Sequence, residues 1–394
     1  MKENWFTWDS GLGEDEFKRR MERIRRGMQR RNLDALIIYT SPREFPNASG
    51  HVRYVSNWSG DRDRGSSLVI LPAEGHPELI INSENYMPMA KEASWIKAIR
   101  VMKSSLGVEA KNSLGRSGIK KGVLGLVGSN EMTKDEYDGF QKALIEYDLR
   151  KSEEVLDEVR LVKSSNEIEL HRKTAQICDE AFEGFKRFAK PRVREYEAWA
   201  EMEYIAARRG VEKSGCTIAS GPYVGQQPVT PRARKFEKND LVIVSSVFRF
   251  RGYWAQVIRT GSIGKSSGRG EEIFNLISEA QKQGIKALKP GDTLMKVYES
   301  ISDVMNPNGH EKQNHIHFRL GHGMGLSYAE KPGLIFHSLL PDYDIKVQSG
   351  MVIEIHPNIL LSDQVLGAAL GDLCLVTDNG AESLTKAERE FFAT

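Results

Sequence analysis

Histidine and carboxylate side chains stand two residues apart near the C-terminal end of the chain. Glu354 and His356 belong to an apolar, strand-like run that begins at Met351. Successive side chains of a strand point to opposite faces, so these two project to the same face, roughly 7 Å apart. Histidine titrates near neutral pH and can serve as a general acid or base. Glu354 could orient the imidazole, accept a proton or bind a cationic substrate; the alternative is a solvated carboxylate at a rim.

The three cysteines are the other residues with nucleophilic or metal-binding chemistry. Cys178, Cys216 and Cys374 lack the C-x-x-C spacing of zinc and redox motifs. We expect buried free thiols in a reducing compartment. The alternative is a catalytic cysteine, for which no histidine stands at a recognisable spacing.

The composition limits the class of protein. The chain has 394 residues, which favours two domains over one core. Its 56 basic and 54 acidic residues nearly cancel, so charge gives no reason to expect nucleic acid or membrane binding. A basic run from Lys18 to Arg31 is expected to be the solvated face of a helix. Apolar runs fall far short of the ~20 residues that cross a bilayer, and no signal-peptide pattern opens the chain. We therefore expect a cytoplasmic protein.

Two kinds of pattern divide the chain. The first part alternates helical and strand patterns, which indicates an α/β domain, although residues 103–121 give a weaker signal. The second part begins with long helical patterns up to residue 209, interrupted at Pro191, and ends with clustered strands, which indicates an α+β domain. We expect domains at residues 1–155 and 156–394. The other expected helices are 14–32, 86–95, 133–147, 268–288 and 292–304, and the expected strands are 35–40, 67–71, 78–82, 97–101, 123–127, 216–219, 241–248, 252–261, 315–320, 351–355, 365–369 and 372–377.

Six short segments occur in a fixed order between residues 158 and 380. They are Arg160-Leu161-Val162-Lys163-Ser164 with Glu167, Lys238-Asn239-Asp240-Leu241-Val242, Gly252-Tyr253 with Arg259-Thr260, Gly321-His322-Gly323-Met324-Gly325, Ser349-Gly350-Met351-Val352 with Pro357, and Gly367 with Asp372. This order resembles the pita-bread catalytic domain shared by methionine aminopeptidase, aminopeptidase P, prolidase and creatinase. The first 150 residues resemble the creatinase-type N-terminal domain. The resemblance implies an α+β protein in which a pita-bread domain follows an α/β creatinase-type domain.

The resemblance also implies a metal centre, which this sequence has altered. The family's metal enzymes hold two divalent ions with Asp, Asp, His, Glu and Glu. The corresponding positions here hold, in that order, Ser245, Gln256, His322, His356 and Gly371. Two dications need several anionic oxygens, and these positions supply none. We therefore expect no metal cofactor; a single zinc on His322 and His356, with Gln256 or water, is the alternative.

Creatinase is the metal-free branch of the family, and its working residues match this chain only in part. Glutamine stands in the place of the catalytic histidine, within the segment 226–232, Gln-Gln-Pro-Val-Thr-Pro-Arg. Ile258 and His356 replace its two active-site glutamates, and its substrate-binding arginine falls near Leu340. Arg64 matches an N-terminal arginine that reaches the site of a partner subunit. Creatine is therefore a poor candidate for the substrate.

The chemistry of the remaining polar residues suggests roles for them. His322, His356 and Glu354 are the catalytic candidates, with satisfied core histidines as the alternative. Small residues of the terminal strands, from Gly367 to Gly371, are expected to line a cavity. Arg249 and Arg251 are either carboxylate clamps or solvated side chains. The substrate-binding candidates, which supply hydrogen bonds or charge, are Gln226, Gln227, Ser245, Gln256 and Arg64.

Three functions follow from this set of residues. The first is a metal-independent, creatinase-like enzyme that hydrolyses a C–N bond of a small polar nitrogen-containing metabolite by histidine acid–base catalysis. The second is elimination, rearrangement or decarboxylation in the same pocket. The third is a non-catalytic binding module that retains the peptidase-like fold. The expected partners are the small-molecule substrate and a second copy of the chain, with no nucleic acid and no membrane.

Overall fold

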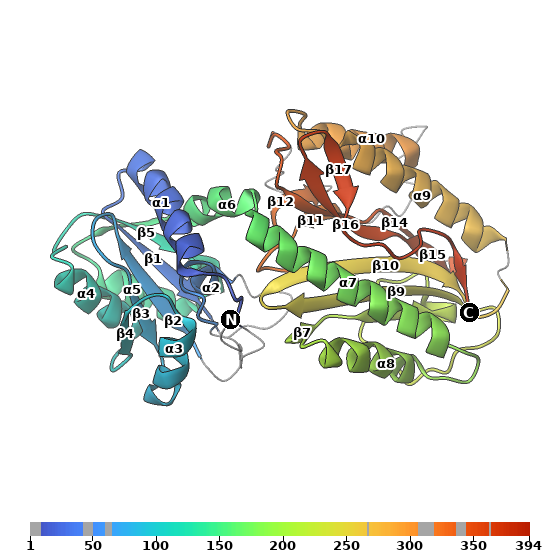
Figure 1. Ribbon diagram of the computed structural model, residues 1–394, viewed down its shortest axis with the longest axis horizontal. Helices are drawn as coiled ribbons and strands as arrows, with labels where there is room; N and C mark the ends of the chain where they lie inside the picture. Colours follow the sequence, from blue (N-terminus) through green and yellow to red (C-terminus); the bar gives the residue numbers. More distant parts are fainter. Residues whose placement is uncertain are drawn as a thin grey trace. The chain divides into compact units, whose positions relative to one another are not determined.

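A computed structural model describes residues 9–41, 50–59, 65–265, 268–305, 319–335, 344–361 and 364–394. It contains two compact units, residues 1–160 with 326–328 and residues 161–325 with 329–394 (Figure 1). The domain bounds expected from the sequence, 1–155 and 156–394, stay a prediction.

The N-terminal unit is built on one mixed sheet of six strands. The strand order is β4-β3-β2-β1-β5-β6, with β1 antiparallel to β2 and parallel to β5. Ile37, Tyr39, Ile70 and Leu126 belong to one buried apolar cluster of this unit. Its strands are β1 (Ala35–Thr40), β2 (Ser67–Pro72), β3 (Glu78–Ile81), β4 (Ala98–Val101), β5 (Val123–Val127) and β6 (Asp148–Lys151).

Helices of this unit follow the apolar periodicity of the sequence. The helix α1 buries Phe17, Met21, Ile24 and Met28 on one face, as expected for a helix with a basic, solvated side. The helix α4 occupies the segment where the sequence signal was weak, because its apolar face is short and buries mainly Ala110 and Leu114. The helices are α1 (Glu14–Arg30), α2 (His51–Ser56), α3 (Met87–Ala93), α4 (Leu106–Arg116), α5 (Lys134–Ala143) and α6 (Glu153–Leu161).

The C-terminal unit is a large curved sheet with helices packed along it. The strand order is β12-β11-β13-β16-β10-β9-β7; β17 pairs with β16, β18 with β10 and β8 with β9, and β14 and β15 form a separate ribbon. Its strands are β7 (Lys213–Ser214), β8 (Thr217–Ser220), β9 (Leu241–Phe250), β10 (Tyr253–Ser262), β11 (Arg319–Gly323), β12 (Glu330–Ile335), β13 (Val352–Ile355), β14 (Asn358–Leu361), β15 (Leu366–Ala369), β16 (Gly371–Thr377), β17 (Gly380–Ser383) and β18 (Phe392–Ala393).

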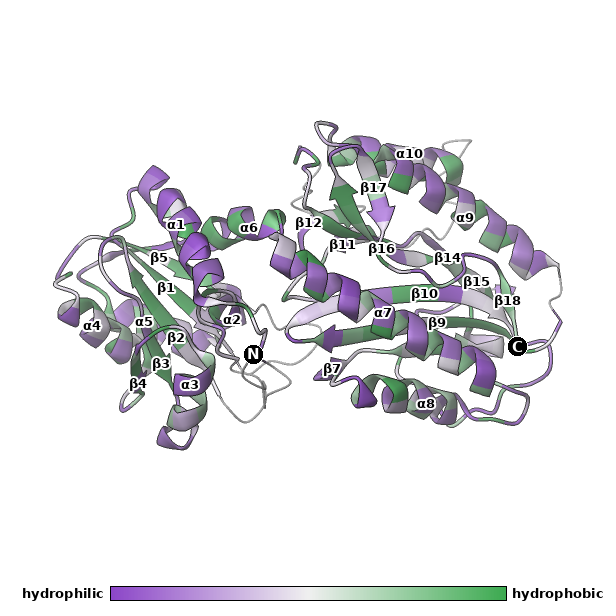
Figure 2. Ribbon diagram, in the orientation of Figure 1, coloured by the Kyte–Doolittle hydropathy of each residue, from purple (hydrophilic) through white to green (hydrophobic). Residues whose placement is uncertain are grey.

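Among the described residues, four helices cover this sheet: α7 (Ser165–Phe188), α8 (Glu195–Arg208), α9 (Arg269–Ala287) and α10 (Leu294–Met305). The helix α7 runs along β9 and β10, while α9 pairs with α10 and packs against the terminal strands (Figure 1). A capping box opens α7, in which the hydroxyl of Ser164 accepts from the N–H of Glu167 and the Glu167 side chain accepts in return. The exposed faces of these helices are hydrophilic, whereas the strands beneath them are largely hydrophobic (Figure 2).

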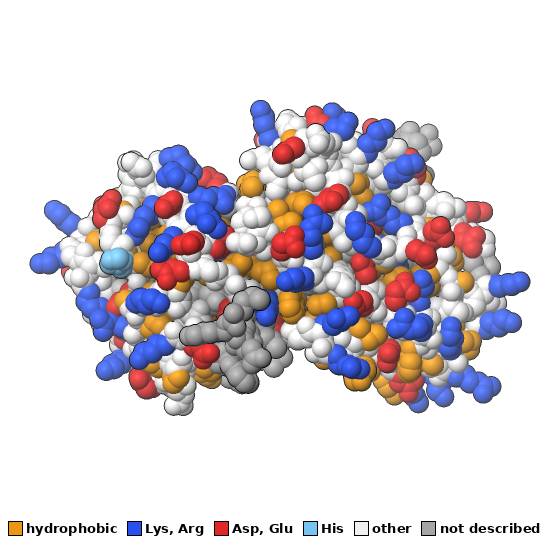
Figure 3. Space-filling model, in the orientation of Figure 1, with side chains coloured by type: hydrophobic (Ala, Val, Ile, Leu, Met, Phe, Trp, Pro, Cys, Tyr) orange, Lys and Arg blue, Asp and Glu red, His pale blue; other side chains and the backbone are white. Residues whose placement is uncertain are grey.

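The outer surface agrees with the balanced charge of the sequence. Basic and acidic side chains alternate on the face shown in Figure 3, and no large field of one sign covers it. No helix in the described ranges combines the length and the apolar character needed to cross a membrane. This architecture is the α+β arrangement predicted from the sequence, in which a unit with a large sheet and long helices follows an α/β unit.

Candidate functional site

Neighbouring strands of the large sheet bring the candidate residues to one face. His322 of β11 lies opposite Glu354 of β13, Gly371 of β16 lies opposite Ile258 of β10, and Ile258 lies opposite Ser245 of β9. Residues that lie opposite one another on antiparallel strands project to the same side. Ile353 and Ile355 belong to the apolar cluster formed with α9 and α10, so Glu354, between them, points to the other face.

The two histidines lie next to each other on this face. The ring centroids of His322 and His356 are 5.2 Å apart, with planes inclined at 64°. Nδ1 of His322 is 3.0 Å from the carbonyl oxygen of Gly323; because a carbonyl only accepts, Nδ1 carries the proton. The backbone of His356 is also fixed, since its N–H donates to Leu320 and its carbonyl accepts from the amide of Asn358. Both rings are buried, which gives this pair a defined geometry.

The residues at the two aspartate positions satisfy each other. Nε2 of Gln256 donates to Oγ of Ser245 at 2.8 Å, and both side chains are buried. This hydrogen bond joins β10 to β9 and carries no charge. The amide oxygen of Gln256 is a neutral acceptor, not a carboxylate.

Glu354 is fully enclosed. Neither of its carboxylate oxygens has a hydrogen-bond partner among the described residues. Burial raises the pKa of Glu354 well above its usual range; Asp372 adds to the rise and Arg259 opposes it. The alternative of a solvated rim carboxylate is therefore wrong.

Gly371 stands at a crowded position of the sheet. A Cβ at this position would lie 2.7 Å from Oε1 of Glu354, 2.8 Å from Cγ1 of Ile258 and 3.0 Å from Cβ of Ile258. These separations are shorter than ordinary van der Waals contact, so a side chain at position 371 requires its neighbours to move.

A buried charge network supports this region from behind and was not singled out from the sequence. The guanidinium of Arg259 donates to Asp372 at 2.8 Å and to the carbonyl oxygens of Ile258, Gly371, Ala387 and Glu388. Asp372 also accepts from Gln281, Thr385 and Arg389. Arg259 and Asp372 are each 0% exposed. The only sequence signal was that both residues stand in segments resembling the pita-bread family.

Other predicted residues lie elsewhere. Gln226 and Gln227 are exposed in the loop after Val224, and Arg64 lies outside the described residues. Arg249 is not a free clamp, because it pairs with Glu212 at 3.3 Å and stacks over Trp254. Arg251 occupies the turn between β9 and β10, with a φ of 48° and its guanidinium over Phe250. Ala368 packs in the apolar cluster formed with α9 and α10, so its predicted place in a cavity wall is wrong.

The cysteines behave as buried thiols. All three are free and buried. Burial raises the pKa of Cys216 to about 12 and holds the pKa values of Cys178 and Cys374 well above their usual range. A thiolate is therefore strongly disfavoured at each position, which gives no support to a catalytic cysteine.

The two-cation centre implied by the resemblance does not fit these residues. Two dications require several anionic oxygens, whereas the five positions supply two imidazoles, an amide, a hydroxyl and a glycine. Within the part of the chain that the structure describes, no group of three or more His, Cys, Asp or Glu side chains is placed to hold a metal ion.

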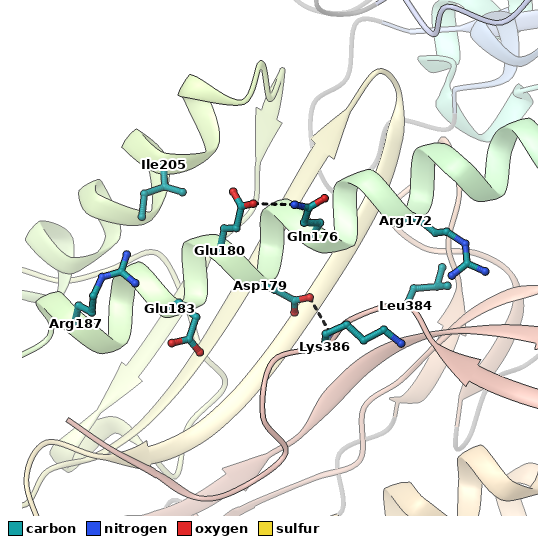
Figure 4. A pocket seen from close by; sticks show the side chains of 9 residues that line it. All are labelled: Arg172, Gln176, Asp179, Glu180, Glu183, Arg187, Ile205, Leu384 and Lys386. Carbon is teal, nitrogen blue, oxygen red and sulfur yellow. Dashed lines mark hydrogen bonds between the residues drawn. The ribbon is translucent and has the colours of Figure 1, made fainter.

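A groove of about 720 Å³ lies on the helical side of the same unit (Figure 4). Asp179 of α7 points toward the C-terminal segment, where it accepts hydrogen bonds from the backbone N–H groups of Lys386 and Ala387. Burial raises the pKa of Asp179 to about 6. No residue predicted from the sequence lines this groove. The lining residues are Arg172, Gln176, Asp179, Glu180, Glu183, Arg187, Ile205, Leu384 and Lys386.

Comparison with known proteins shows relatives of nearly the same length. The chain is 27% identical over 377 residues to a Xaa-Pro dipeptidase of Pyrococcus furiosus, covering 95% of this chain and 99% of the relative. It is 28% identical over 381 residues to the Xaa-Pro dipeptidase of Pyrococcus horikoshii, with 95% and 99% coverage. The crystal structure of the Pyrococcus horikoshii prolidase superposes with a TM-score of 0.80 at 26% identity, covering 95% of this chain and 100% of that one.

These findings correct the first function expected from the sequence. A metal-independent, creatinase-like enzyme for a non-peptide C–N bond is wrong, because the full-length relatives are named as dipeptidases and the matching family is one of metallopeptidases. The error arose from treating altered metal-ligand positions as the mark of the creatinase branch. The altered positions show only that the family's metal-ligand residues are missing. They do not indicate creatinase, because the working residues of creatinase match this chain only in part.

Family models account for both units. The model of the creatinase/prolidase N-terminal domain matches residues 20–162. The model of metallopeptidase family M24 matches residues 169–378, more than half of the chain. The resemblance to the pita-bread family is confirmed, and the chain belongs to metallopeptidase family M24.

Proposed function

We propose that this chain binds short peptides of the Xaa-Pro class on the face that carries His322 and His356. The observation that carries the proposal is the full-length similarity to Xaa-Pro dipeptidases, which extends over both units and leaves almost none of the relative unmatched. A protein that keeps both units of such a dipeptidase keeps the framework that would shape a dipeptide site.

The polar side chains of this face suit the groups of a dipeptide. We assign the peptide carbonyl or the terminal carboxylate to the imidazole of His356, which can donate one hydrogen bond. Because Nδ1 of His322 carries the proton and donates to Gly323, Nε2 of the neutral His322 ring would instead accept from the terminal amine. The amide of Gln256, held by Ser245 at 2.8 Å, would present its oxygen to the terminal amine. The ring of proline has no N–H, so the remaining contact on that side would be apolar.

The remaining candidates keep supporting roles in this proposal. Gln226 and Gln227 would close over the dipeptide from their exposed loop. Arg64 would pair with the terminal carboxylate of the dipeptide. Glu354, which is enclosed behind the imidazoles, would help to hold the geometry of His356. We also propose that the chain forms a homodimer in the cytoplasm, with Arg64 contributed to the site of the second copy.

Hydrolysis of the same peptides is the second candidate function, and membership of a metallopeptidase family favours it. Cleavage needs a nucleophilic water, and two divalent ions would supply it in such a family. The donors at the five positions do not fit two ions, so we assign peptide binding to this chain as the primary function. Turnover is expected to be far below that of an enzyme with a complete centre.

Isothermal titration with Ala-Pro, using Pro-Ala as the matched control, tests the proposal. Ala-Pro should bind with a measurable Kd, and Pro-Ala should bind at least about tenfold more weakly, which corresponds to roughly 1.4 kcal/mol. Proline release, followed in the same samples with and without added Mn²⁺, measures hydrolysis separately. Equal or absent binding of the two dipeptides contradicts the proposal, whatever the rate of proline release.

A further inference from the structure

We infer that the chain does not assemble the two-cation centre of its family, and that packing of Ile258 and Glu354 closes the place of the fifth ligand at Gly371. This inference concerns the metal and the packing, and it holds whether or not the proposed peptide binds.

The first step is the chemistry of the donors. Ser245 and Gln256 stand at the two aspartate positions and are already joined by a hydrogen bond of 2.8 Å. Neutral oxygens repay little of the cost of removing a dication from water, particularly where both side chains are buried. Neither residue brings a negative charge, so this pair is a poor substitute for two carboxylates.

The second step is the geometry at Gly371. Ile258 lies directly opposite Gly371 in the pairing of β10 with β16. The Cβ atom of a residue at position 371 would lie 3.0 Å from Cβ of Ile258, an atom that moves only with its strand. Oε1 of Glu354, which would lie 2.7 Å from the same Cβ, is the end of a side chain and could rotate away. Ile258 is therefore the main obstacle.

The third step is the rigidity of the two strands. The carbonyl oxygens of Ile258 and Gly371 both accept from Nη1 of the same buried guanidinium, that of Arg259, at 2.8 Å each. This shared donor holds β10 and β16 together next to the crowded pair. The strands cannot separate at position 371 without disturbing these bonds, so a single substitution to glutamate would not rebuild a ligand there.

Metal content measures the first part of the inference. Protein purified without chelator is dialysed against Mn²⁺ or Zn²⁺, passed through a desalting column and analysed by inductively coupled plasma mass spectrometry. We expect well below one divalent ion per chain and no change in Tm on addition of either ion. One or two tightly bound ions per chain would overturn the inference.

A double-mutant cycle measures the closure. Gly371→Ala should lower the Tm by several degrees, because overpacking is costly in a well-packed core. Ile258→Ala removes Cγ1, the contact at 2.8 Å, and keeps the Cβ at 3.0 Å, so the loss in the double variant should be smaller than the sum of the two single losses without disappearing. Val257→Ala is the matched control: Val257 is buried, adjacent in sequence and on the opposite face, so it should combine additively with Gly371→Ala.

A second comparison keeps the test valid if Gly371→Ala does not fold. Gly139→Ala, at a helical position where an added Cβ meets nothing within 4 Å, should leave the Tm unchanged or raise it. Loss of folding in Gly371→Ala but not in Gly139→Ala, with recovery in the Ile258→Ala background, supports the closure. Equal Tm values for wild type and Gly371→Ala, or strict additivity with Ile258→Ala, overturn it.

Discussion

Replacing Asp372 by asparagine should be among the most damaging conservative changes in the C-terminal unit. The carboxylate pairs with the guanidinium of Arg259 at 2.8 Å, and both side chains are 0% exposed. Asparagine keeps the volume but removes the charge, so Arg259 would remain as a buried cation without its counter-ion. Breaking a buried pair in this way costs about 3–5 kcal/mol.

The expected shift in melting temperature follows from that figure. For a unit of this size, 1 kcal/mol corresponds to about 2–4 °C, so Asp372→Asn should lower the Tm by roughly 6–20 °C. Differential scanning calorimetry and urea unfolding measure the change. The control is Asp138→Asn, which removes an exposed i,i+4 pair with Lys134 and should change stability by less than about 0.5 kcal/mol. A loss below about 1 kcal/mol for Asp372→Asn would refute the role given to this network.

Three further predictions concern pH, capping and ligand binding. Burial lowers the pKa of His171 to about 3, so the folded state keeps it neutral while the unfolded chain takes up a proton below its ordinary value of 6.5. The stability contributed by neutral His171 is present above pH 6.5 and is lost as the pH falls toward 3, by about 1.4 kcal/mol per pH unit. Urea denaturation of His171→Gln across this pH range should show a shallower loss of unfolding free energy than wild type. Ser164→Ala removes the cap of α7 and should cost about 1 kcal/mol in urea unfolding, and an undiminished midpoint would contradict the cap. Gln256→Ala should weaken Ala-Pro binding about two- to tenfold in calorimetry, and unchanged affinity would remove Gln256 from the site.

The sequence was sufficient for the fold because its signals were redundant. Apolar periodicity located α1, the alternation of β13 placed Glu354 and His356 on one face, and six ordered segments pointed to one family. Short elements were missed for a physical reason. Strands such as β7, β12 and β17 are held by their neighbours in the sheet, so their own few residues carry little periodicity.

The site was harder to predict because its chemistry depends on contacts between distant segments. The identities of Ser245 and Gln256 at the two aspartate positions were evident beforehand, but the hydrogen bond between them was not. Nothing in the sequence indicated that the carboxylate of Glu354 would be fully enclosed beside Gly371 or that Ile258 would crowd that position. The substrate was missed for a different reason: altered ligand residues report on the metal, whereas the similarity to dipeptidases is distributed over the whole chain.

Calorimetric titration of the wild-type chain with Ala-Pro, run before and after exhaustive dialysis against EDTA, measures directly whether the dipeptide binds without a metal. We expect a measurable Kd for Ala-Pro that is unchanged by the chelator, because binding is assigned to His322, His356 and Gln256 rather than to a metal. Absence of Ala-Pro binding in both samples, or binding that disappears with the chelator and returns with Mn²⁺, would contradict it.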